Sequence, residues 1–271
     1  MSETESAEDH IYPCVCKFCE KIENMRLAIP GDQSHSCVKA DRRDEHCRDI
    51  ATLIMSCPKR VTLLVGPDKV RIKCHKALLG FKSEYFDAIC FGGFSTAESK
   101  EIEVQEEDPK AIQAFVAWLY SAQILPTACP LSDLWLLGDR IRSPEFMNEV
   151  MHTIFERIEK ERIEASEYKQ MFIATSPDSK LRQLFRNTIL QEGPLGVDND
   201  YSDDFMEAWK DLMKQGGELV VDIALRGSLF TIGTCTEHRW KSHNKYLEPI
   251  EAFTTRPIED FIAGKPRAGT R

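Results

Sequence analysis

The chain has 271 residues and a formal net charge of -9 at pH 7, and its apolar and charged fractions are those of an ordinary globular protein. The negative charge argues against general affinity for nucleic-acid phosphates, and no run of 18 apolar residues could form a membrane span. The first ten residues are acidic and polar, without the apolar core of a signal peptide. We therefore expect a protein of the cytoplasm, the nucleus or both, with no membrane or nucleic-acid partner.

Residues 1–48 form a polar arm, rich in Cys and His, that we expect to be largely disordered. Zinc takes four Cys or His ligands in a tetrahedron, and three cysteines with one histidine, or four cysteines, could be assembled here. The alternative is a flexible segment with reduced thiols, because only one Cys-x-x-Cys is present and the later residues lack a standard spacing. The candidate zinc ligands are Cys14, Cys16, Cys19, His35, Cys37 and Cys47.

The segment after the arm alternates between helical and strand patterns. A short apolar helix is expected over residues 49–56, and the turn "GPDK" between two aliphatic runs predicts a β-hairpin over 61–73. Ser83 is placed to cap a helix over "EYFDAIC", and "EIEVQ" predicts a third strand with Ile102 and Val104 pointing inward. "CHK" at residues 74–76 could suggest a reactive site, but we interpret His75 as a helix-start residue that packs and hydrogen-bonds locally.

The second half of the chain is predicted to be helical. Asp108 before Pro109 is a strong helix start, and further helices are expected over 131–141 and from Pro144. Residues 161–250 are expected to form an α-helical extension, in which "ELVVDIALRG" fits a strand or a helix and we favour the helix. Residues 251–271 are expected to be a disordered tail. The expected helix caps of the extension are Ser166, Ser179 and Ser202.

The order of these elements over residues 49–160 resembles the BTB/POZ domain. The loop "FGGFSTAES" followed by "DPKAIQAFVAWLYS" is especially similar to BTB proteins of filamentous fungi. The resemblance implies an α+β fold, with a small mixed β-sheet flanked by α-helices. Two positions depart from the family pattern. Arg60 replaces an acidic residue that in some members lines a co-repressor groove, and Ala122 stands where members often have glycine. The residues that carry the resemblance include Val61, Leu63, Val65, His75, Leu78, Leu79, Tyr85, Phe86, Phe115, Leu119 and Tyr120.

The resemblance implies a non-enzymatic protein that binds protein partners. No G-x-S-x-G, P-loop or dinucleotide fingerprint is present, so no catalytic residue is predicted. Homodimers in the family commonly use the first helix, whose apolar residues here could equally belong to the chain's own core. Residues of that helix that could bind a partner are Ile50, Leu53, Ile54 and Met55.

A cullin is the other partner that the resemblance implies, with the chain as substrate adaptor of a cullin-type ubiquitin ligase. Cullin-binding members often carry a hydrophobic residue, any residue and then glutamate in the loop that here contains Phe94, Thr96 and Glu98. Glu98 matches this pattern. Thr96 replaces the hydrophobic residue and removes on the order of 1–2 kcal/mol of apolar contact. The alternative function is a zinc-binding regulatory protein that uses the N-terminal Cys/His set.

Overall fold

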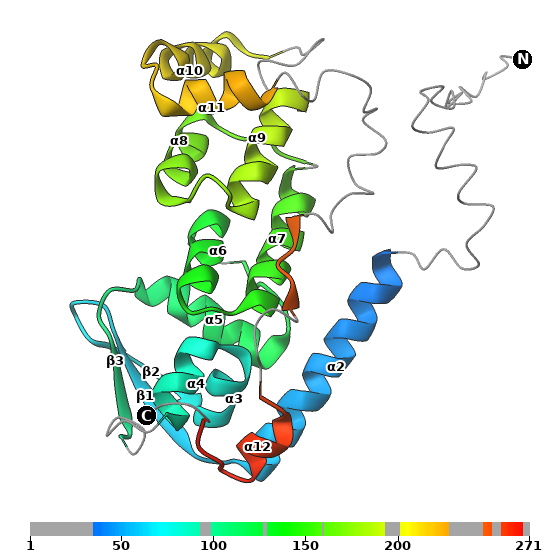
Figure 1. Ribbon diagram of the computed structural model, residues 1–271, viewed down its shortest axis with the longest axis vertical. Helices are drawn as coiled ribbons and strands as arrows, with labels where there is room; N and C mark the ends of the chain where they lie inside the picture. Colours follow the sequence, from blue (N-terminus) through cyan, green and yellow to red (C-terminus); the bar gives the residue numbers. More distant parts are fainter. Residues whose placement is uncertain are drawn as a thin grey trace, which may run out of the picture.

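The protein is seen here as a computed structural model that describes residues 35–92, 99–126, 129–158, 160–192, 201–227, 246–250 and 256–267. At one end lies a small sheet covered by helices, and helices of the second half of the chain extend from it (Figure 1). Among the described helices, none is both long and apolar enough to cross a membrane.

The sheet has three strands in the order β2-β1-β3. β1 (Arg60–Val65) is central, pairs antiparallel with β2 (Val70–His75) and pairs parallel with β3 (Glu101–Val104). The predicted hairpin and third strand are therefore confirmed, and Ile102 and Val104 are buried as expected.

Five helices build the layer that packs on the sheet and continues away from it. Two predicted capping residues act as expected: Ser83 Oγ accepts a hydrogen bond from Phe86 N at 3.2 Å, and Asp108 Oδ1 accepts one from Lys110 N at 2.6 Å. The cores of this layer and of the following extension form one continuous cluster. The five helices are α3 (Lys76–Lys82), α4 (Glu84–Phe91), α5 (Pro109–Ser121), α6 (Leu131–Arg140) and α7 (Pro144–Ile158).

The helical extension contains α8 (Ala165–Ala174), α9 (Lys180–Glu192), α10 (Asp203–Lys214) and α11 (Glu218–Gly227). The helical interpretation of "ELVVDIALRG" is confirmed, and the hydroxyls of Ser179 and Ser202 accept hydrogen bonds from the first turns of their helices. The expected cap at Ser166 is wrong. Ser166 lies inside α8, which begins at Ala165 with Glu164 at the N-cap position.

The N-terminal arm requires a correction, because helix α2 runs from His35 to Ser56 instead of beginning at residue 49. The stretch from 35 to 48 was expected to be disordered. It contains neither glycine nor proline, and extending a helix whose apolar end is anchored costs far less than nucleating a new one. His46, which is buried against Trp118, provides a further anchor within this polar stretch.

The C-terminal tail requires a second correction. Residues 256–267, in a segment expected to be disordered, include the short helix α12 (Ile258–Ile262), which packs against α2 and α3. The cause is apolar anchoring: Phe261 is 2% exposed, and the half-buried Ile258 packs against the same core. In Figure 1 this red segment crosses the lower end of α2.

Candidate functional site

The four apolar residues of the first helix do not all face the same way. Ile50 and Leu53 are 7% and 0% exposed and belong to the chain's own core, as the helical period places both on one face. Ile54 is half-buried, whereas Met55 is 84% exposed. Met55 is therefore the member of the predicted set that the structure leaves open for a partner.

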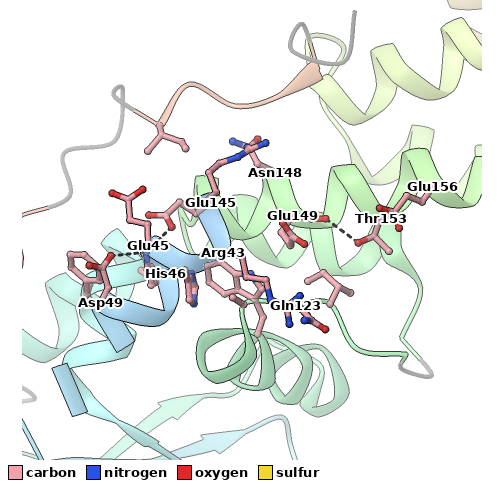
Figure 2. Close-up of a pocket in the computed structure, with 17 residues that line it drawn as sticks. Arg43, Glu45, His46, Asp49, Gln123, Glu145, Asn148, Glu149, Thr153 and Glu156 are labelled. Atoms are coloured by element: carbon pink, nitrogen blue, oxygen red, sulfur yellow. Dashed lines mark hydrogen bonds and ion pairs between the residues drawn. The ribbon is translucent and has the colours of Figure 1, made fainter. Parts of the chain in front are cut away.

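A groove of about 730 Å³ lies between α2, α5 and α7 (Figure 2). Its walls are charged: α2 contributes Arg42, Arg43 and Glu45, and α7 contributes acidic residues such as Glu149 and Glu156. The sequence did not predict this groove. The first helix was expected to begin at residue 49, after Arg42, Arg43 and Glu45, which line the groove from α2.

Lys82, at the floor of the groove, forms ion pairs with both α2 and α7. Its side chain is 4% exposed, and its ammonium lies 2.7 Å from Glu145 Oε2 of α7 and 3.7 Å from Asp49 Oδ2 of α2. His46 lies nearby, with Nε2 3.3 Å from Leu119 O and its ring 4.8 Å from that of Trp118. Burial, with Lys82 adding to it, lowers the pKa of His46 to about 4, so this histidine is neutral at pH 7 and serves the fold.

The Cys74-His75-Lys76 stretch also serves the fold. Tyr120 Oη accepts a hydrogen bond from His75 N at 3.0 Å and lies 2.7 Å from His75 Nδ1, while Arg60 Nε donates to His75 Nε2 at 3.3 Å. Because Nε2 accepts, Nδ1 carries the proton and donates to Tyr120. Burial raises the pKa of the Cys74 thiol to about 12, so it stays protonated and is a poor nucleophile.

The remaining predicted site residues are mostly beyond the described ranges. Cys14, Cys16 and Cys19 lie there, and so do the cullin-loop residues Phe94, Thr96 and Glu98. His35 and Cys37 lie in α2, but their side chains are not described; Cys47, on the same helix, is exposed. Within the described ranges no three His, Cys, Asp or Glu side chains are placed to hold a metal ion. The proposed zinc and cullin sites stay predictions.

The C-terminal segment 256–267, which we call the clasp, covers a face of α3 and α4 that sequence reasoning did not identify. Its Phe261 ring lies 5.7 Å from Phe81 and 5.2 Å from Phe91, at interplanar angles of 82° and 89°. Arg267 of the clasp pairs with Glu84 of α4 at 2.7 Å. Ile258 and Phe261, two apolar residues three positions apart in a polar tail, are the signal that could have indicated this contact.

Residues 246–250 make a second return to the domain. Asn148 on α7 donates through Nδ2 to Glu248 O at 3.0 Å and accepts from Glu248 N at 2.7 Å. Tyr246 packs on Phe155 of the same helix, with ring centroids 5.8 Å apart, and its hydroxyl is 2.7 Å from Asn187 Nδ2 of the extension. These contacts join α7 to α9.

Comparison with known proteins bears on residues 59–157, which match the family model of the BTB/POZ domain. Kelch-like protein 30 of Mus musculus is 29% identical over 93 residues, 34% of this chain and 16% of that protein. Kelch-like protein 30 of Homo sapiens is 30% identical over 84 residues, 31% of this chain and 14% of that protein. The aligned part thus covers a small fraction of either relative, and the similarity to fungal members stays a prediction.

The three-stranded mixed sheet with its flanking helices agrees with the α+β fold of this family. Residues 59–157 of this chain form a BTB/POZ domain, which is a protein-interaction domain.

Proposed function

We propose that this chain is a non-enzymatic protein-interaction protein that self-associates through the outer face of α2 and so presents partners in pairs. The supporting observation is Met55, a large apolar side chain that is 84% exposed at the end of a helix lying next to the BTB/POZ domain. A single exposed methionine is common on protein surfaces. Met55 supports an interface because it lies on the helix that family homodimers commonly use.

The length of α2 suits an interface between two copies. With 22 residues the helix spans about 33 Å. Its N-terminal part stands away from α7 and the body of the molecule (Figure 1). Two such helices packed on each other, or on the neighbouring domain, could reach the roughly 800 Å² per partner that a stable interface commonly buries.

Co-capture of two differently tagged full-length copies tests this proposal. The wild-type chain is expected to capture its differently tagged copy. Met55→Glu in both copies is expected to lower capture at least tenfold, because it places a charge in an apolar contact. Ile173→Glu is the matched control, since Ile173 is 73% exposed and lies on α8 of the helical extension, away from α2. Equal capture by wild type and Met55→Glu would reject α2 as the interface.

We further propose that the chain serves as substrate adaptor of a cullin-type ubiquitin ligase, and Glu98, which matches the glutamate of cullin-binding members, supports this. Purified cullin is expected to be retained by the wild-type chain and lost with Glu98→Ala. Glu106→Ala, an exposed glutamate before α5, is the control that should retain it. Retention that does not change with Glu98→Ala would show that this contact is wrong.

The alternative proposal is zinc binding by the N-terminal Cys/His set, which Cys16-x-x-Cys19 supports. Metal analysis of the purified full chain is expected to give one zinc per chain if a site forms. Zinc clearly below one equivalent would reject this alternative.

A further inference from the structure

The clasp lies in a site built from three kinds of contact, the first of which is aromatic. The side chain of Phe261 is buried between Phe81 of α3 and Phe91 of α4. Cys57 Sγ donates to Phe261 O at 3.3 Å. A Cβ atom on Gly80 would lie 2.7 Å from Phe91 and 3.0 Å from Phe261, so the absence of a side chain at Gly80 makes room for both rings.

The second kind of contact is an arginine fork at one side of the site. Arg267 N donates to Phe91 O at 2.8 Å, which fixes the clasp backbone against the end of α4. Its guanidinium donates to Glu84 O at 2.9 Å and pairs with Glu84 Oε1 at 2.7 Å. Burial alone would raise the pKa of Glu84, but the hydrogen bonds from Arg267 and Arg142 outweigh it and lower that pKa.

The third kind of contact is a buried carboxylate. Asp87 is 4% exposed, and the guanidinium nitrogens of Arg256 and Arg267 lie 3.7 and 3.9 Å from its oxygens. Arg256 also stacks over the ring of Phe261 at 4.4 Å. A carboxylate this deeply buried requires a cationic neighbour, because an unpaired charge in a protein interior is strongly unfavourable.

The clasp does not use all the hydrogen-bonding capacity of this site. Among the described residues, no hydrogen bond reaches Asp87 Oδ1, and none is made by Nε or Nη2 of Arg256, although these atoms are buried. Ion pairs at 3.7 and 3.9 Å are longer than the charge-assisted hydrogen bonds that arginine and carboxylate commonly form. An arginine placed closer to Asp87 would form a charge-assisted hydrogen bond that the clasp does not make.

We propose that the face formed by Gly80, Phe81, Glu84, Asp87 and Phe91 is a peptide-binding site for a partner segment that carries an aromatic residue between two arginines. The clasp is its built-in occupant, and a partner segment binds by displacing it. The chemistry of the ligand follows from the rings, the missing side chain at Gly80 and the two carboxylates. This inference rests on the proposed interaction function, for which it names the chemistry of one partner.

A labelled peptide with the sequence of residues 254–271 serves as the probe for the full chain. The wild-type chain is expected to bind it weakly, because its own clasp competes. Arg267→Ala in the full chain weakens the clasp and is expected to raise the affinity for the peptide at least tenfold, and Phe261→Ala to do the same. Adding Asp87→Asn and Glu84→Gln to Arg267→Ala should abolish binding, and a peptide with Phe261→Ala should not bind. Equal affinity of wild type and both weakened chains, or equal binding of the alanine peptide, would overturn the proposal.

Hydrogen exchange in the wild-type chain gives an answer that does not depend on any variant folding. Saturating unlabelled peptide is expected to speed exchange of the clasp amides at Ala263, Gly264 and Lys265, which donate backbone hydrogen bonds in the docked clasp. Unchanged exchange would overturn the proposal. Light scattering on the same samples separates this proposal from self-association. A dimer whose clasp amides do not respond to the peptide rejects this inference alone. A monomer whose clasp amides do respond rejects only self-association through α2.

Discussion

Ala122 ends α5 in the left-handed region, with φ of 56°. Its N–H donates to Trp118 O at 2.8 Å, so this backbone conformation closes the last turn of the helix. A side chain in this region costs about 1 kcal/mol or more, and glycine avoids that cost. The departure from the family's usual glycine is therefore a local source of strain next to the groove.

We expect Ala122→Gly to raise the free energy of unfolding by about 0.5–1 kcal/mol, because relief of the left-handed strain outweighs the greater freedom of glycine in the unfolded chain. Ala114→Gly, inside the same helix, is the control and should lower it by about 1 kcal/mol. Urea unfolding measures both variants. A loss of stability in Ala122→Gly as large as in the control would contradict this account.

His46 should make the stability depend on pH. Its pKa is about 4 in the folded chain and 6.5 in the unfolded chain, so between these values the unfolded state binds more protons. The free energy of unfolding should fall by about 1.5 kcal/mol through this group as the pH drops from 6.5 to 5. In His46→Gln that contribution should vanish. Urea unfolding at both pH values tests this, and an identical pH dependence in the two chains would show that His46 is not buried as described.

At the scale of elements, α6 and α7 pack closely because Gly138 has no side chain. A Cβ atom there would lie 2.6 Å from Met147 Cγ and 3.2 Å from Phe146 Cδ1. Gly138→Ala should lower the free energy of unfolding by about 1–3 kcal/mol, since the clash outweighs the better helix propensity of alanine. Asp139→Ala on the exposed side of α6 should change it by less than about 0.5 kcal/mol. Thermal unfolding that ranks the two variants in the opposite order would refute this packing argument.

The elements were predictable from sequence where local signals coincide. Asp108-Pro109 marks the start of α5, and the "GPDK" turn sets the hairpin, because capping and turn chemistry depend on near neighbours. The N-terminal half of α2 and the clasp were missed for the opposite reason. Polar residues 35–48 show little apolar periodicity. In the tail, Ile258 and Phe261 indicate a short buried face, but nothing near them in the sequence identifies the distant helices on which they pack. The groove could not be predicted either, because it depends on both α2 and α7.

At the scale of the whole molecule, segments after the helical extension return to the BTB/POZ domain. Residues 246–250 lie against α7, and the clasp lies against α2, α3 and α4. The clasp is thereby placed beside the helix through which we propose self-association. Of the residues predicted to form the interface, Ile50 and Leu53 are buried in the core, whereas Met55 faces outward. Stability therefore depends on Ile50 and Leu53, and association depends on Met55. Variants of Met55 should therefore affect binding without unfolding the domain.

Sedimentation equilibrium of the full chain over a range of micromolar concentrations tests the central claim most directly. The account predicts that the wild-type mass rises from one chain to two with concentration. It also predicts that Met55→Glu stays at the mass of one chain with an unchanged unfolding transition. A wild-type chain that keeps the mass of a monomer throughout, or a Met55→Glu chain that dimerises as readily, would contradict it.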